Sequence, residues 1–291
     1  MRKALMLFFT LLLTLCLTAC AYADTAKVMT SFYPMYIFAL NVFDGIDAVE
    51  IDCMTAPETG CLHDYQLLVG DMMKLSDAEA LIVCGAGMES YLPDVAQQFP
   101  DLAVIDCSQG IDLLAEEGEE GELNAHTWLD VQNAIKIVNT IAVEGSRLFP
   151  EYADRILANA QSYTERLNAL DQQLREELAP MQGKAIVTFH DAFPYFANAY
   201  GLQIAAVISE EHEETLSPAQ LSQVIETVRK ADNPPLFTEP QYSSAAAYAI
   251  SAETGAAIYT LDPLVSGEYE KDAYEKGMQR NADALLEAFA Q

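Results

Sequence analysis

The sequence predicts an α/β protein of two lobes, each a four-stranded parallel sheet flanked by helices, joined by one long linking helix. Three observations support this prediction. Short apolar runs alternate with longer helical patterns, which is typical of βα units and a parallel sheet. This rhythm occurs twice in the chain, and a long stretch without glycine or proline separates the two occurrences. The 291 residues are enough for one large domain or two of ordinary size.

Short apolar runs mark the expected strands, four in each half of the chain. The expected strands are 26–33, 48–54, 80–85 and 102–107 in the first half, and 184–189, 203–209, 235–239 and 256–261 in the second. Helical segments are expected between them, for example 64–75, 88–98, 218–231 and 243–254.

The stretch between the two halves predicts a single helix. From Glu151 to Leu178 there is no glycine or proline, and apolar residues recur at helical spacing. Pro150 precedes the stretch and Pro180 ends it. A hairpin of two shorter helices is the alternative, but no turn residue interrupts the pattern. We therefore expect an N-terminal lobe over 20–150, a linking helix over 151–180 and a C-terminal lobe over 181–291.

The first residues have the pattern of an export signal. Arg2 and Lys3 precede an apolar run of about 15 residues, short of the ~20 that cross a bilayer as a helix. The run ends in LTAC (17–20), which resembles a bacterial lipobox, whose cysteine becomes the lipidated first residue. We expect residues 1–19 to be removed and Cys20 to anchor the protein at the outer face of the cytoplasmic membrane. An ordinary secretory signal with an incidental Cys20 is the alternative.

The charge balance restricts the possible partners. The chain has 44 acidic and 15 basic residues and a formal net charge of −29. Such a chain is repelled by nucleic acid phosphates and by anionic lipid head groups, and it attracts cations. We therefore expect no nucleic-acid partner.

Cysteine usage is compatible with an exported protein. Cys53, Cys61, Cys84 and Cys107 follow the export signal. In an oxidising compartment they could form two disulfides, for which we favour Cys53–Cys61 and Cys84–Cys107. Four reduced cysteines are the alternative. Since no CxxC spacing occurs, the sequence gives no support for a thiolate zinc site.

The candidate ligands follow expected strands. His63 and His126 come after the second and fourth strands of the first half, and His190 and Asp262 after the first and last strands of the second half. In open α/β sheets, ligands bind in the crevice outside the carboxyl ends of the strands. The sequence therefore predicts a site between the lobes, to which each lobe contributes two side chains.

Three imidazoles and one carboxylate suit a tetrahedral divalent metal ion, of which Zn²⁺ fits best. Taken singly, each histidine is more often structural, and only their joint placement favours a metal site. Asp191, beside His190, is expected to cap a helix or to support a ligand. His212, in the acidic segment SEEHEE (209–214), is expected to be a surface residue or a secondary metal contact.

Four motifs carry a family resemblance over nearly the whole chain after the export signal: HDYQLL, HTWLD, TFHDAFPYF and LDPL. In this order and spacing they resemble the cluster A-I metal-binding lipoproteins of bacterial ABC importers (the ZnuA and TroA type). The resemblance implies a monomeric binding protein that delivers a transition metal to a membrane permease. It implies His63, His126, His190 and Asp262 as ligands. A histidine at the third position usually accompanies zinc in this family and a glutamate manganese or iron, so we expect Zn²⁺, with Mn²⁺ as the alternative.

The sequence departs from the family pattern at several places. Val131 follows HTWLD where proline is usual, and LDPLVSG replaces LDPLG behind Asp262. The acidic loop EEGEEGE (116–122) occupies the position of a histidine-rich loop. It is either a solvated loop or a segment that concentrates cations near the cleft.

Two other function classes are less compatible with the sequence. A zinc hydrolase needs an open coordination position and a general base, and the chain has no HExxH or GxSxG motif. A binder of a large anionic chelate needs basic residues, which are scarce. We therefore expect binding without catalysis. The resemblance also allows an additional role in cell adhesion.

Overall fold

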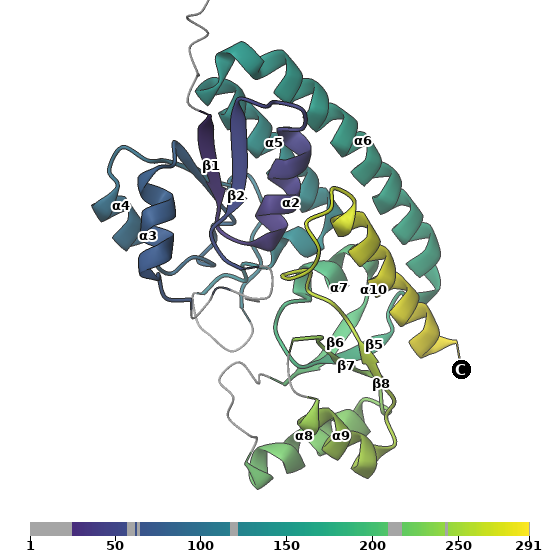
Figure 1. Ribbon diagram of the computed structural model, residues 1–291. Helices are drawn as coiled ribbons and strands as arrows, with labels where there is room; N and C mark the ends of the chain where they lie inside the picture. The colour runs from purple at the N-terminus through teal and green to yellow at the C-terminus, as the bar shows by residue number, and fades with distance from the viewer. Residues whose placement is uncertain are drawn as a thin grey trace, which may run out of the picture.

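The computed structural model describes residues 25–56, 62, 65–116, 122–208, 217–241 and 244–290. Two four-stranded parallel sheets form two lobes, as the sequence predicts (Figure 1). Both sheets have the same order, in which the first strand of each lobe lies between its second and third. This order places the ends of the first and third strands of each lobe side by side.

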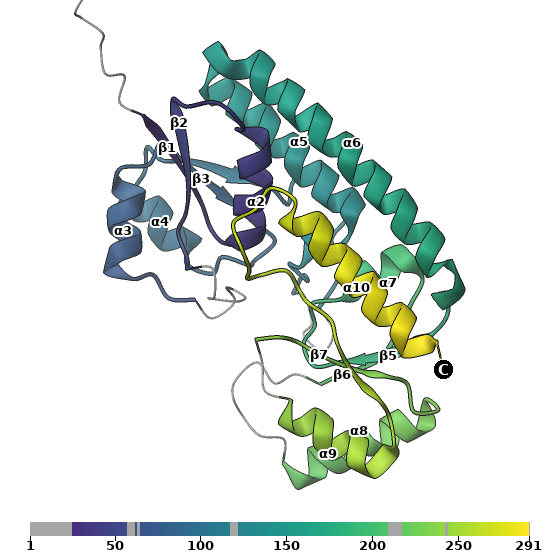
Figure 2. The same ribbon diagram turned by 45° about the vertical axis from the view of Figure 1, so that its right-hand side comes forward.

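The first sheet has the order β2-β1-β3-β4. Helices α3 and α4 lie on one side of it, and α2 and α5 on the other (Figures 1 and 2). The strands are β1 (Ala26–Thr30), β2 (Val49–Cys53), β3 (Ala80–Val83) and β4 (Ala103–Asp106). The helices are α2 (Tyr33–Val42), α3 (Val69–Ser76), α4 (Leu92–Gln98) and α5 (Val131–Leu148), the last preceded by the short 3-10 helix η1 (Thr127–Leu129).

The second sheet has the order β6-β5-β7-β8. Helices α8 and α9 cover one of its faces, and α7 and α10 lie on the other (Figures 1 and 2). The strands are β5 (Ala185–Thr188), β6 (Gln203–Val207), β7 (Leu236–Thr238) and β8 (Ile258–Thr260). The helices are α7 (Pro194–Tyr200), α8 (Pro218–Lys230), α9 (Ala245–Thr254) and α10 (Ala273–Phe289).

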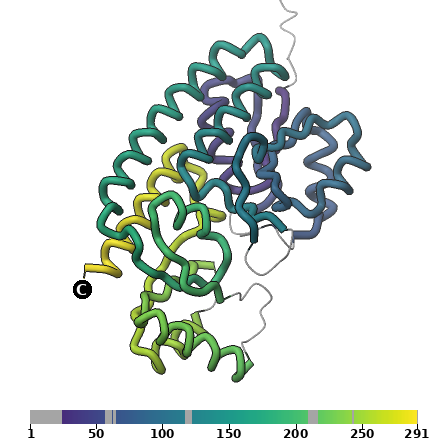
Figure 3. The backbone as a smooth tube through the Cα atoms, turned by 180° about the vertical axis from the view of Figure 1, so that it is seen from behind, coloured from purple at the N-terminus to yellow at the C-terminus, as the bar shows by residue number. Residues whose placement is uncertain are grey.

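The predicted linking helix is α6 (Ala153–Leu178), which follows a single 3-10 turn, η2 (Pro150–Tyr152). At ~1.5 Å per residue it is about 39 Å long, and it runs along both lobes (Figure 3). Its buried side chains form the expected apolar stripe. The helix does not stand alone, because it packs against α5, α2 and α10.

The lobes share most of their apolar core. One buried cluster extends from Val28 in β1 through α6 to Leu285 in α10, and a smaller cluster fills the space between the second sheet and helices α8 and α9. Because side chains alternate along a strand, Ile186 of β5 belongs to the first cluster and Val187 to the second. The shared core favours a fixed arrangement of the two lobes.

All eight expected strands are present, each shorter than its apolar run. The helix expected over 64–75 begins only at Val69, where the Asp71 carboxylate accepts a hydrogen bond from the Leu68 amide at 2.8 Å. Apolar runs extend beyond the hydrogen-bonded ladder because residues after a strand are still buried at the sheet edge.

The structure contradicts the predicted Cys84–Cys107 disulfide. Cys84 and Cys107 are free, buried thiols, although they follow the neighbouring strands β3 and β4. The Cys84 thiol donates to the Ala125 carbonyl at 3.3 Å, and burial raises the pKa of both thiols well above the usual value. Cys53 is also free and buried, and its predicted partner Cys61 lies outside the described residues.

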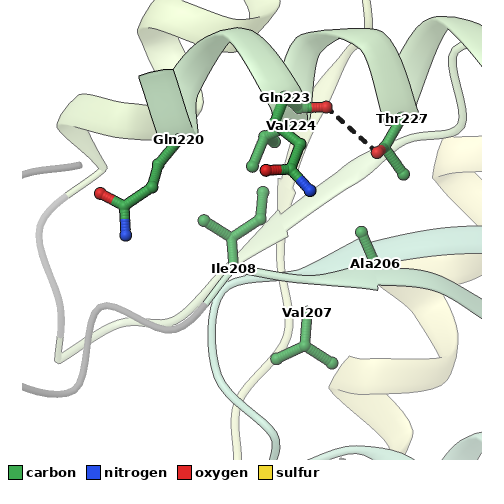
Figure 4. Close-up of a pocket in the computed structure, with 7 residues that line it drawn as sticks. All are labelled: Ala206, Val207, Ile208, Gln220, Gln223, Val224 and Thr227. Atoms are coloured by element: carbon green, nitrogen blue, oxygen red, sulfur yellow. Dashed lines mark hydrogen bonds between the residues drawn. The ribbon is translucent and has the colours of Figure 1, made fainter. Parts of the chain in front are cut away.

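A shallow groove of about 360 Å³ lies between the edge strand β6 and helix α8. Figure 4 shows Ala206 and Ile208 on the strand side and Gln220, Gln223 and Val224 on the helix side, whereas Val207 points to the opposite side of the strand. It belongs to the side of the C-terminal lobe that carries α8 and α9 and includes none of the candidate ligands.

Buried Glu89 joins the ends of the two central strands of the first sheet. Its carboxylate accepts hydrogen bonds from the Ser31 hydroxyl at 2.7 Å, the Cys84 amide at 2.8 Å and the Gly85 amide at 3.0 Å. Burial raises the pKa of Glu89 to about 7 despite these three donors. The charged carboxylate is therefore unfavourable in the folded protein relative to the unfolded chain.

This raised pKa predicts a pH-dependent stability. The folded state binds a proton that the unfolded state releases above about pH 4.5, so the free energy of unfolding falls as pH rises toward 7. The full shift corresponds to about 3 kcal/mol. In urea unfolding of the metal-free protein, Glu89→Gln should therefore gain stability relative to the wild type between pH 5 and pH 8. Glu151→Gln, at an exposed position, should run parallel to the wild type; a parallel profile for Glu89→Gln would contradict the prediction.

Candidate metal site

The structure brings together two of the predicted ligands, one from each lobe. His126 directly precedes η1, and His190 comes two residues after β5. Their ring centroids are 4.7 Å apart, the rings are nearly perpendicular, and both residues are almost fully buried. His63 lies outside the described residues, as do His212 and Cys20.

The His126 ring is oriented by Asn124. The Asn124 side-chain oxygen lies 3.3 Å from Nδ1 of His126 and accepts the His126 backbone amide at 3.0 Å. With the proton on Nδ1, the imidazole donates to this oxygen and keeps its Nε2 lone pair for a ligand.

The predicted supporting residue Asp191 contacts Asn124. The Asn124 amide nitrogen donates to the Asp191 carbonyl at 2.6 Å and to the Asp191 carboxylate at 3.1 Å. Asp191 thus supports His126, the histidine of the other lobe, through Asn124. The sequence indicated a supporting role but not which histidine is supported, because the partner lies 67 residues away along the chain.

The His190 ring faces Glu239, a residue that the analysis of candidate ligands missed. Nδ1 of His190 lies 3.1 Å and 3.2 Å from the two carboxylate oxygens, and both side chains are buried. Glu239 directly follows β7, the strand beside β5. This strand-end position is the same sequence signal that identifies the other candidates.

Asp262 follows β8 and is held by its own loop and by helix α10. One carboxylate oxygen accepts the Leu264 amide at 2.8 Å, and the other lies 3.5 Å from the Arg280 guanidinium. The Asn281 side chain bonds both the amide and the carbonyl of Asp262. Within the described ranges, no three His, Cys, Asp or Glu residues form a group that could hold a metal ion. The structure therefore assembles the pair of histidines and leaves Asp262 outside it.

Hydrogen bonds cross between the lobes around this pair. The Tyr195 hydroxyl donates to the Asn124 carbonyl at 2.8 Å and accepts the Leu114 amide at 2.9 Å. On the other side, the Trp128 indole donates to the Pro263 carbonyl at 2.8 Å. These bonds fix the segment that contains His126 against the segments that contain His190 and Asp262.

The family model described as the periplasmic component A of a zinc-uptake complex matches residues 28–288. The chain belongs to this ZnuA family. Among curated proteins, it is 27% identical to the manganese-binding lipoprotein MntA of Halalkalibacterium halodurans, over all of both chains. It is 29% identical to the zinc-binding lipoprotein AdcA of Streptococcus pneumoniae, over 97% of this chain and 60% of AdcA.

Solved structures of the ZnuA family have the same fold. The binding protein FpvC of Pseudomonas aeruginosa, in complex with Ni²⁺, superposes with a TM-score of 0.81 at 26% identity, covering 91% of this chain and 97% of FpvC. A zinc-bound deletion mutant of ZnuA gives a TM-score of 0.79 at 27% identity, covering 91% and 98%. The match to the family model extends over both lobes, from β1 into α10.

Removing the Asn124 side chain should affect both the site and the lobe contact. In Asn124→Ala, the carbonyl and carboxylate of buried Asp191 lose the hydrogen bonds from the Asn124 amide. This loss should lower the unfolding free energy by about 1–3 kcal/mol. Loss of the bond that orients His126 should also weaken Zn²⁺ binding by about 10- to 100-fold in competition with a chelator. Asn159→Ala is the matched control, since Asn159 bonds two backbone carbonyls away from the site. It should reduce stability only; equal zinc affinities in the two variants would refute the role of Asn124.

Proposed function

We propose that the protein captures a divalent transition metal, zinc in preference to manganese, in the cleft between its lobes and delivers it to an ABC permease. The observation that carries this proposal is the pair of buried histidines, His126 and His190, contributed by opposite lobes with ring centroids 4.7 Å apart. Each ring has its Nδ1 beside a buried oxygen atom, and Nε2 is the nitrogen of each ring that we propose to bind the metal.

The proposed ligand set is His63, His126, His190 and Asp262. Binding by Asp262 requires its carboxylate to exchange the contact with Arg280 for the metal. Three nitrogen ligands and one oxygen ligand favour Zn²⁺, whereas Mn²⁺ prefers more oxygen ligands. Relatives named for either metal occur, AdcA for zinc and MntA for manganese. Ligand chemistry is therefore the basis of the proposed preference.

We propose that lipidated Cys20 anchors the protein, as a monomer, at the outer face of the cytoplasmic membrane. Several relatives are named lipoproteins, which supports this placement. Over the described ranges, no helix is long and apolar enough to cross a membrane. The proposed activity is binding and delivery, with no bond made or broken in the cargo.

Competition experiments test the metal preference. The metal-free protein should bind Zn²⁺ more tightly than Mn²⁺ by at least tenfold when each ion is titrated against the same chelator, since imidazole nitrogen binds zinc more strongly. His190→Glu, which replaces a nitrogen ligand by oxygen, should reduce this ratio. Tighter binding of Mn²⁺ by the wild type would overturn the zinc assignment, and no binding of either ion would overturn the proposed function.

A further inference from the structure

Glu239 and His190 occupy equivalent places at the ends of two neighbouring strands. In the parallel pair of β5 and β7, Thr188 lies opposite Phe237. Two residues further along each strand are His190 and Glu239. The sheet register itself therefore places this carboxylate beside this imidazole, and the contact of 3.1 Å follows from the strand pairing.

The surroundings of Glu239 favour a carboxylate that accepts hydrogen bonds. Its side chain is fully buried, and the Gln241 side-chain amide donates to one carboxylate oxygen at 2.7 Å. A buried anion is costly unless donors surround it. When Nδ1 of His190 carries the proton, it can donate a hydrogen bond to the Glu239 carboxylate. The carboxylate therefore favours the Nδ1–H tautomer of His190.

The two histidines differ in the charge of their partners. His126 faces the neutral amide oxygen of Asn124, whereas His190 faces a carboxylate. A carboxylate partner increases the electron density that an imidazole offers through its other nitrogen. Nε2 of His190 should therefore be the stronger donor, which favours metals that bind nitrogen strongly.

We propose that Glu239 is a positioning residue that holds His190 as its Nδ1–H tautomer, directs Nε2 into the site, and increases the selectivity for zinc over manganese. The inference rests on the proposed function and names what sets the metal preference of the same site. Zinc depends more on nitrogen donors than manganese does. The negative charge of Glu239 should therefore contribute more to the affinity for zinc than to the affinity for manganese.

Two substitutions separate charge from orientation. In Glu239→Gln, the amide oxygen can still accept from Nδ1, so the tautomer should be kept while zinc affinity falls. Glu239→Ala removes both the charge and the acceptor for Nδ1. The single tautomer should therefore be lost, and zinc binding should weaken by about 10- to 100-fold. The matched control is Glu89→Gln, which alters a glutamate of the same 3% exposure that contacts neither histidine.

The measurements are zinc and manganese affinities by chelator competition, and long-range proton–nitrogen NMR of His190 in the metal-free protein. We expect the Nδ1–H form alone in the wild type and in Glu239→Gln, both tautomers in Glu239→Ala, and a reduced zinc-to-manganese ratio in both Glu239 variants. Wild-type affinities and an unchanged tautomer in these variants would overturn the role of Glu239. Absence of zinc binding by the wild type would instead overturn the proposed function. If Glu239→Ala does not fold, the near-isosteric Glu239→Gln decides through its affinity ratio.

Discussion

The hydrogen bonds of Asn124 are the constraint on which the site depends. One side chain orients His126 through its oxygen and binds Asp191 of the other lobe through its nitrogen. Because the same residue makes both contacts, the His126 ring cannot be oriented independently of the lobe arrangement. The separation of His126 and His190 is therefore a property of the whole two-lobed fold.

The rest of the molecule supports this arrangement. Helix α6 packs against helices of both lobes, and the larger buried cluster is continuous between them. Moving the two lobes apart as whole units would expose this core and break the bonds made by Tyr195 and Trp128. Smaller movements of the segments around the site would leave the shared core and these bonds between the lobes intact. Asp262 lies in such a segment, since its carboxylate contacts only the Leu264 amide and, at 3.5 Å, the largely exposed Arg280 among the described residues.

The sequence predicts the strands and the strand-end candidates because both depend on local patterns. Apolar runs of strand length repeat twice, and the helical spacing between Glu151 and Leu178 indicates one long helix. The contacts that orient the histidines depend instead on the register of strands and on the meeting of the lobes. Asn124 is therefore not evident from spacing, and the strand-end position of Glu239 does not show which side chain it contacts. The predicted Cys84–Cys107 disulfide is wrong for a similar reason, because the strand ends place these residues near each other without fixing where either thiol points.

Two buried glutamates lie beyond the third strands of their sheets and have different roles. Glu89 follows the third strand of the first sheet, and Glu239 follows the third strand of the second. Glu89 is surrounded by two backbone amides and a hydroxyl, so its carboxylate ties strand ends together within the N-terminal lobe. Glu239 has an imidazole and a side-chain amide as partners. In the proposed site, Glu239 acts through His190 and Asp262 by exchange, and among the described residues both of these carboxylates belong to the C-terminal lobe. In the N-terminal lobe, the described hydrogen-bond contact of the His126 ring is the amide oxygen of Asn124, so the oxygen atoms beside Nδ1 of the two described histidines differ in charge.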